Sequence, residues 1–248
     1  MLHEARSQIK SVMVRRLWKR TKIGSLSDIK TAFKVIKFAR SPLRLLFYLS
    51  QSRSQNRDDL IVFDFYNYQN SGFFVEIGCT DGELISNTKM LEELGWSGVI
   101  FEPNQYWHRQ GLEESRLATV TTESEWVNYF FKRKKSNYKN QFGMEFEIEH
   151  YILNDGAEKC NYPLFKDINL PPIVEFLSID IEINPIIILQ SLPLKVCQFK
   201  LVSYKHNYYP NWRNAVAKFL FDLNYVPIYQ NEFRETDWYL FQENGNSN

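Results

Sequence analysis

Residues 73–102 constrain this chain more than any other stretch. They open with an apolar run ending at Ile77, which has the β-branched and aromatic make-up of a buried strand. Two glycines follow, then a segment with helical apolar spacing that Gly95 is expected to end. A second apolar run, Val99 to Phe101, completes the pattern. A strand, a glycine turn, a helix and another strand predict a parallel crossover of the nucleotide-binding kind.

The residues at the two strand ends predict a ligand site on this crossover. Gly78 and Gly82 let the backbone turn tightly and lie close to a ligand, and Glu102 could accept both hydroxyls of a ribose. The G-x-G-x-x-G spacing of dinucleotide sites is absent, and Glu76 and Asp81 put negative charge where a pyrophosphate would bind. S-adenosylmethionine (SAM) fits better, because it carries an ammonium and a sulfonium and no phosphate. The alternative is an ordinary glycine turn beside an incidental acid.

Several motifs resemble those of the FkbM-type family of SAM-dependent methyltransferases. They are FVEIG-x-x-DG from Phe74, SNT from Ser86, LEELGWSGVIFEPN from Leu91, FLSIDIE from Phe176, a strand ending near His206-Asn207, and DWYL from Asp237. The resemblance implies a Rossmann-like class I methyltransferase fold, an α/β architecture with a mostly parallel central sheet and helices on both faces. It also implies SAM as methyl donor and, usually, O-methylation of a sugar or other small hydroxyl compound.

The donor site is expected at the first crossover, with Glu102 on the ribose hydroxyls. The other donor-site candidates are Glu76, Gly78, Asp81, Gly82, Asn87 and Thr88. Asp180 and Glu182 end a later strand two residues apart, so they would point to one side at the edge where α/β sheets bind ligands. Such a pair could orient the acceptor hydroxyl, take its proton or hold a divalent cation. A solvated strand end is the alternative.

The chain departs from the family pattern at two places. Glu182 is followed by residues 183–185, Ile-Asn-Pro, where the family has a glycine and a second glutamate, so the turn must differ or the site is altered. Lys205 stands where the family has glutamate, which reverses a charge. His206 is the general-base candidate, since its unperturbed pKa lies near neutrality. A buried strand-end histidine is the alternative.

Basic residues are concentrated at the N-terminus. Residues 1–57 hold 14 Lys and Arg against two acids, whereas the remainder holds 16 against 27, although the whole chain has a net charge of only +1. Apolar spacing predicts three helices in residues 1–57, the last opened by Pro42. We therefore expect a basic helical extension or lid over 1–57 and a methyltransferase domain over 58–248. Residues 51–59 are polar and predict a linker.

The basic extension has several possible roles. It could pack on the acidic remainder, as we expect for residues 26–50, or contact nucleic acid or an anionic membrane surface. For residues 1–22 a surface-bound or frayed helix fits as well as a partner-binding one. Further along, the basic run at residues 132–135 predicts a solvated loop, and residues 137–170 predict loops and short strands.

Cysteine usage and hydropathy bear on the compartment. Cys79, Cys160 and Cys197 are odd in number and form no C-x-x-C pair, as is typical of free thiols in a reducing compartment. No apolar run approaches the roughly 18 residues of a membrane span. The prediction is a cytoplasmic protein without a transmembrane segment.

Two functions of different classes fit these patterns. The favoured one is SAM-dependent O-methylation of a small, carbohydrate-like acceptor. The other is a catalytically degenerate methyltransferase-fold module that binds a partner or polyanion through its basic N-terminal region. The intact block from Glu76 to Glu102 favours SAM binding, whereas the departures at residues 183–185 and Lys205 weaken the case for activity.

Overall fold

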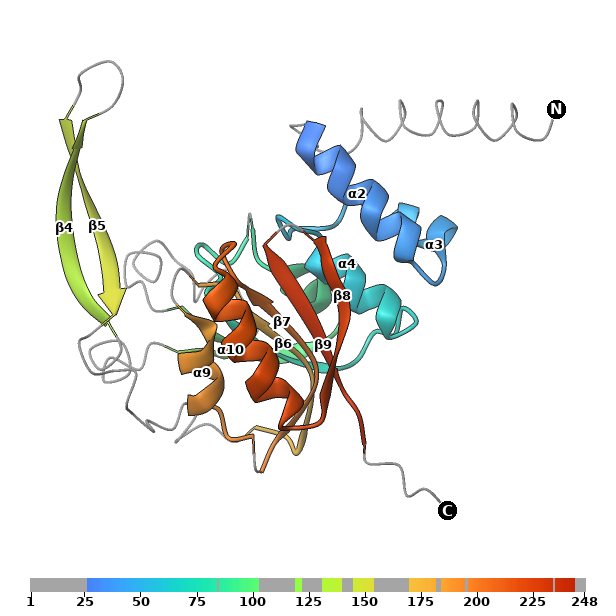
Figure 1. The fold of residues 1–248 in the computed structure, drawn as a ribbon. Helices are drawn as coiled ribbons and strands as arrows, with labels where there is room; N and C mark the ends of the chain where they lie inside the picture. Colours follow the sequence, from blue (N-terminus) through green and yellow to red (C-terminus); the bar gives the residue numbers. More distant parts are fainter. Residues whose placement is uncertain are drawn as a thin grey trace.

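A seven-stranded sheet forms the centre of the molecule, in the order β3-β2-β1-β6-β7-β9-β8 (Figure 1). The computed structural model describes residues 26–83, 85–102, 119–121, 131–139, 145–153, 170–181, 184–194, 196–233 and 235–243. The parallel strands are β1 (Phe73–Ile77), β2 (Ser97–Phe101), β3 (Thr119–Thr121), β6 (Ile173–Ile179) and β7 (Gln198–Lys205). The strands β8 (Tyr225–Phe233) and β9 (Thr236–Phe241) form an antiparallel pair at one edge.

This topology confirms the Rossmann-like class I methyltransferase fold expected from the sequence. Strand β1 pairs with β2 on one side and with β6 on the other, and all three run parallel. The strand order therefore reverses at β1, and open α/β sheets bind ligands at the carboxyl ends of the strands beside such a reversal. The predicted crossover is also confirmed, with α5 (Lys89–Glu93) between β1 and β2.

Helices cover both faces of the sheet (Figure 1). On one face α9 (Pro185–Ser191) and α10 (Pro210–Phe221) pack over alternate residues of the strands, among them Ile77. The other face is covered by α5 and by α2 (Leu26–Phe38), α3 (Pro42–Tyr48) and α4 (Asp58–Phe65), over residues such as Phe74. Because side chains alternate along a strand, each strand end sends neighbouring residues to opposite faces.

The basic run at residues 132–135 lies in a strand, so the loop predicted there is wrong. It belongs to β4 (Phe131–Lys139), which pairs with the antiparallel β5 (Glu145–Leu153) in a separate two-stranded sheet. The register sets Lys135 opposite Glu149 and Lys139 opposite Glu145. The pairing depends on a second strand further along the chain, so the run itself does not signal it.

The described part of the N-terminal extension shares a core with the rest of the chain. Ala32, Val35 and Leu45 are buried in the same cluster as Leu60 and Phe74. This agrees with the packing expected for residues 26–50, while a separate domain over 1–57 stays a prediction. Among the described helices, none has the length and apolar character that a membrane crossing requires.

One buried carboxylate holds the turn between α2 and α3 against α4. Asp64 accepts hydrogen bonds from the backbone N–H groups of Arg40 (2.6 Å) and Ser41 (3.2 Å) and from the Tyr68 hydroxyl (2.5 Å). Charge-assisted hydrogen bonds of this kind are roughly twice as strong as neutral ones. The α2–α3 hairpin is therefore attached to the core by polar as well as apolar contacts.

Asp64→Asn is expected to destabilise the protein by about 1.5–3 kcal/mol, because the amide offers a donor where Asp64 now accepts. Urea unfolding measures this loss, and faster hydrogen exchange at the Arg40 and Ser41 amides would locate it. The control is Glu93→Gln, which removes a half-exposed ion pair with Arg53 and should change stability by less than about 0.5 kcal/mol. Equal effects of the two substitutions would contradict this account of the hairpin.

Candidate functional site

The glycine turn after β1 lies against the end of β6. Gly78 has a φ of +84°, and a Cβ added there would stand 2.2 Å from the carbonyl oxygen of Asp180. Its N–H donates to the carbonyl of Phe101 (2.7 Å), while the Asp180 N–H donates to the carbonyl of Ile77 (2.9 Å). Only glycine fits here, so the carboxyl ends of β1, β2 and β6 meet at one point.

Glu102 lies at the end of β2 and binds the glycine turn. Its buried carboxylate accepts, through Oε2, the N–H groups of Cys79 (3.0 Å) and Thr80 (2.7 Å). The turn closes with a hydrogen bond from the Gly82 N–H to the Cys79 carbonyl, and Asp81 accepts the Glu83 N–H at 2.9 Å. The structure thus brings together the acid predicted for the ribose and the turn predicted to face the donor.

Glu76 lies beneath the loop that carries the SNT motif. Its fully buried carboxylate accepts hydrogen bonds from the Ser86 hydroxyl (2.9 Å), the Asn87 N–H (2.7 Å) and the Thr88 hydroxyl. A buried carboxylate is tolerated because donors satisfy its charge. Glu76 and Thr88, both donor-site candidates, therefore shape the loop around Asn87.

Asn87 connects this loop to two other segments. Its Nδ2 donates to the Ser178 hydroxyl (3.0 Å) and is 3.4 Å from Asp180 Oδ2, and its Oδ1 accepts from the Ser54 hydroxyl (2.6 Å). Ser54 lies in residues 51–59, where the sequence predicted a polar linker. The segment does connect α3 to α4, but it is not solvated throughout, because Ser54, Asn56, Asp58 and Asp59 are buried while Gln51, Arg53 and Gln55 are exposed.

Asp58 is a site residue that the sequence analysis missed. It is 2% exposed in the first turn of α4, and its Oδ1 has no hydrogen-bond partner. Burial raises the pKa of Asp58 well above its usual range, and the charges of Asp180, Asp59 and Glu76 raise it further. Its backbone N–H donates to the Ser54 hydroxyl at 3.0 Å, one bond from Asn87. The only signal in the sequence is an acid opening a helix that is apolar almost all round.

The neighbouring Asp59 has a different environment. Its carboxylate accepts from the Ser52 hydroxyl (2.6 Å) and from the N–H groups of Arg53 (2.6 Å), Ser54 (3.1 Å) and Leu60 (2.8 Å). Asp59 therefore holds the backbone at the start of α4. Of this adjacent pair of acids, Asp58 is the one left with an unsatisfied oxygen.

The charge reversal at Lys205 is compensated within the structure. Lys205 Nζ lies 3.3 Å from Asp180 Oδ1 and 3.8 Å from Glu235 Oε1. Asp180 keeps 26% of its side chain exposed at the end of β6, so it can reach a ligand. Glu182, the other acid of the predicted pair, lies outside the described residues.

The other departure from the family pattern, at residues 183–185, ends at the start of a helix. Pro185 is in the first turn of α9, and the side chain of Asn184 caps it by accepting the Ile186 N–H at 3.2 Å. Proline costs nothing there, because the first amides of a helix have no intrahelical partner. Asn184 and Pro185 thus form a capped helix start, while Ile183 lies outside the described residues.

His206 is buried, and its ring nitrogens are engaged. Nδ1 accepts the Tyr208 N–H at 3.0 Å, so the neutral ring carries its proton on Nε2, which faces Asp237 Oδ1 at 3.9 Å. Burial lowers the pKa of His206 despite the charge of Asp237. An imidazole with its lone pair bound and its other nitrogen protonated has no site for a substrate proton. The geometry therefore favours a buried, structural histidine at the strand end over a general base.

Asp180 and His206 belong to separate clusters. Asp237 accepts both Nε (2.7 Å) and Nη2 (2.8 Å) of Arg213 and, at 3.2 Å, the Tyr204 hydroxyl, on the face covered by α10. A hollow of about 330 Å³ lies beside this cluster and His206. Asp180 instead contacts Asn87 and Lys205. The structure does not combine Asp180 and His206 into one catalytic pair.

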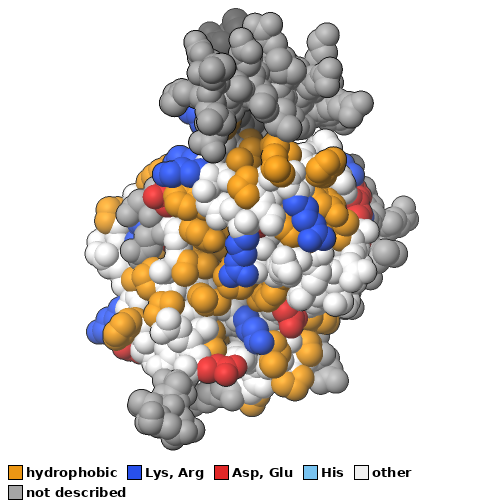
Figure 2. Space-filling model, turned by 90° about the vertical axis from the view of Figure 1, so that its right-hand side faces the viewer, with side chains coloured by type: hydrophobic (Ala, Val, Ile, Leu, Met, Phe, Trp, Pro, Cys, Tyr) orange, Lys and Arg blue, Asp and Glu red, His pale blue; other side chains and the backbone are white. Residues whose placement is uncertain are grey.

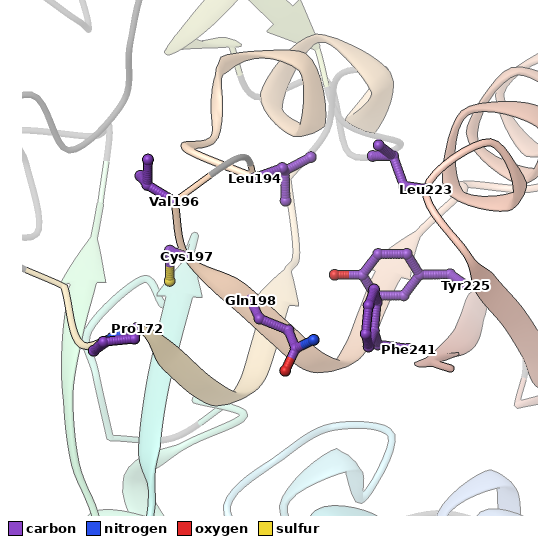
Figure 3. A pocket seen from close by; sticks show the side chains of 8 residues that line it. All are labelled: Pro172, Leu194, Val196, Cys197, Gln198, Leu223, Tyr225 and Phe241. Atoms are coloured by element: carbon purple, nitrogen blue, oxygen red, sulfur yellow. The ribbon is translucent and has the colours of Figure 1, made fainter. Parts of the chain in front are cut away.

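A second hollow, of about 290 Å³, lies at the opposite end of the strands, near the start of β7 (Figure 3). Its lining includes Cys197, whose thiol donates to the Pro171 carbonyl at 3.2 Å. Burial raises the pKa of this thiol to about 11, so it is not a nucleophile at neutral pH. Within the described residues, no group of three or more His, Cys, Asp and Glu side chains is arranged to hold a metal ion.

Neither a family model nor a curated protein sequence matches the chain. Among solved structures it is similar to a candidate RNA methyltransferase from Pyrococcus horikoshii (10% identity, 88% of this chain and 100% of that one, TM-score 0.42). It is also similar to an O-methyltransferase from Bacillus cereus solved with S-adenosylhomocysteine (12% identity, 89% and 93% coverage, TM-score 0.41). A third similarity is to the fibrillarin–Nop5p complex (8% identity, 71% and 74% coverage, TM-score 0.38). All three are distant, so the class I methyltransferase fold is assigned from the strand order.

His206→Asn is expected to cost about 1 kcal/mol at pH 7, because the amide oxygen can still accept the Tyr208 N–H. The difference in the free energy of unfolding between the parent and the variant should shrink as the pH falls below about 6.5. There the unfolded histidine gains a proton that the folded one, with its lowered pKa, does not, so the parent alone loses this stability. Urea unfolding at pH 7.0 and 5.5 measures this difference, and an NMR-measured pKa for His206 above 6.5 would refute the assignment.

Proposed function

We propose that this chain is a SAM-dependent methyltransferase of the FkbM type that O-methylates a hydroxyl on a sugar or other small molecule. The observation that carries the proposal is the convergence of the glycine turn, Glu102, Asp58 and Asp180 at the carboxyl ends of β1, β2 and β6. This is the point where an open α/β sheet binds its ligand. The sugar-like acceptor rests on the motif resemblance.

The charges at this point suit a cationic donor. Burial and the nearby charges of Asp180, Asp59 and Glu76 raise the pKa of Asp58, and Asp58 Oδ1 is buried without a partner. A buried carboxylate oxygen without a donor costs free energy unless a ligand supplies one. The ammonium of SAM would supply that donor, whereas a pyrophosphate would meet repulsion.

In methyl transfer from SAM, the protein forms no covalent bond with either reactant; it positions them and accepts a proton. SAM, when bound, supplies a methyl group activated by its sulfonium. The chain must hold the acceptor oxygen in line with that methyl group and accept the hydroxyl proton as the new C–O bond forms. Asp180 fits the proton-accepting role better than His206, because it is partly exposed at the strand end and Lys205 balances its charge. Glu182 on the acceptor side, and a divalent cation there, both stay predictions.

Glu102→Gln is expected to weaken binding of SAM and of S-adenosylhomocysteine about ten- to hundredfold. The amide oxygen can still accept the N–H groups of Cys79 and Thr80, but the charged acceptor for the ribose hydroxyls is lost, and hydrogen bonds to charged groups contribute about 1.5–3 kcal/mol. Calorimetric titration measures the change, with Glu93→Gln as a matched control. If the folded parent binds neither ligand, the proposed function is wrong.

Asp58→Asn is expected to stabilise the protein at pH 7 by about 1 kcal/mol while weakening SAM binding. A carboxyl whose pKa is raised on folding opposes folding as the pH rises above its unfolded value of about 4, so the gain should vanish near pH 4. Chemical unfolding at both pH values and calorimetry with SAM measure the two effects.

Asp59→Asn is the control for Asp58→Asn. Both oxygens of Asp59 accept N–H groups, so an amide in either orientation sets a donor against a donor and should destabilise the protein. Destabilisation by both substitutions, with SAM affinity unchanged, would show that Asp58 is a structural residue.

A further inference from the structure

The helices α2 and α3 expose large apolar side chains that the core does not use. Phe33 is 45% exposed, Leu43 70% and Phe47 79%. The same helices bury other residues, including Val35 and Leu45, against the sheet. Leu43 and Phe47 are four residues apart and lie on one side of α3. Together with the basic residues described next, these side chains form the α2–α3 face.

Basic residues predominate on these helices: α2 and α3 contain Lys30, Lys34, Lys37 and Arg44 and one acid, Asp28. Residues 29–57 contain seven basic residues and no acid. Lys30, Phe33 and Lys37 are spaced three and four apart, so they share the outer side of α2, and both lysines are exposed. On this side of the molecule hydrophobic and basic side chains are intermingled and acidic ones are few (Figure 2).

Contacts with the rest of the chain hold several of these cations in place. Lys34 Nζ donates to the Glu232 carbonyl at 2.6 Å, and the Arg44 guanidinium lies over the Tyr68 ring at 4.3 Å. Asp64 clamps the turn between the two helices. The face is thus presented by a fixed hairpin rather than by a free arm.

We propose that the α2–α3 face binds the surface of an anionic lipid membrane. Interfacial membrane helices combine Lys and Arg with Phe and Leu, whose side chains enter the boundary between headgroups and acyl chains. Each basic residue near such a surface adds about 1 kcal/mol of attraction, a factor of about five in affinity. The exposed Leu43 and Phe47 would insert, while Lys30 and Lys37 contact the headgroups.

Other occupants fit the α2–α3 face less well. Protein–protein interfaces are depleted in lysine, and a nucleic acid would pair with the cations but leave the aliphatic Leu43 in water. Residues 1–25 carry seven further Lys and Arg against Glu4 alone, so their charge does not complement the face. The proposal does not depend on methyl transfer and holds equally for an inactive protein of this fold.

The test is sedimentation of the full chain with vesicles of phosphatidylcholine, with and without phosphatidylglycerol. The protein should partition onto the anionic vesicles only, and added salt should weaken the binding because it screens the charges. The double variant Leu43→Ser/Phe47→Ser should lose about tenfold or more in partitioning. Lys30→Gln/Lys37→Gln should lose at least about tenfold.

Phe221→Ser is the matched control, since Phe221 is 72% exposed on α10, across the sheet from α2 and α3. It should leave partitioning unchanged, and the unfolding temperature of every variant should match the parent. Absence of binding, or equal binding to neutral vesicles, overturns the proposal. Preferred binding to single-stranded RNA that Leu43→Ser/Phe47→Ser does not weaken would also overturn it. So would a dimer, detected by light scattering, that this variant abolishes.

Discussion

The Glu76 carboxylate beneath residues 86–88 is the interaction on which the candidate site depends. A buried charge at a strand end is unfavourable alone, and three donors from one loop make it tolerable. Satisfying Glu76 fixes the position of Asn87, which then bonds to Ser54 and Ser178. Glu76 therefore positions residues 86–88 directly. Through Asn87 it also positions Ser54, before α4, and Ser178, on β6.

The sequence predicted the parts of the site that lie within one crossover. The sequence placed Gly78 and Glu102 at the ends of β1 and β2, and Asp180 at the end of the later strand β6, because strand ends, glycines and acids carry local signals. Ser54 and Asp58 were missed, since nothing in a polar segment shows that it folds inward to meet Asn87. The prediction of His206 as a base depends on the motif resemblance together with a pKa near neutrality. Whether its Nδ1 is occupied depends on the Tyr208 backbone, which only the folded structure shows.

The two departures from the family motifs have different structural meanings. Pro185 changes the local backbone but satisfies it, because it opens α9 under the Asn184 cap. Lys205 changes the charge of the site, and it binds Asp180 and Glu235 instead of repelling them. A glutamate at position 205 would add a third negative charge here. The lysine instead places a positive charge beside both Asp180 and Glu235.

One continuous segment joins the basic hairpin to the candidate donor site. From the Asp64 clamp at residues 40–41 the chain passes through α3 and turns inward at Ser54, which bonds to Asn87, before Asp58 opens α4. Asp59 holds the backbone at the start of α4, between these points, with four hydrogen bonds. The segment that follows the α2–α3 hairpin therefore supplies both Ser54, which contacts Asn87, and Asp58.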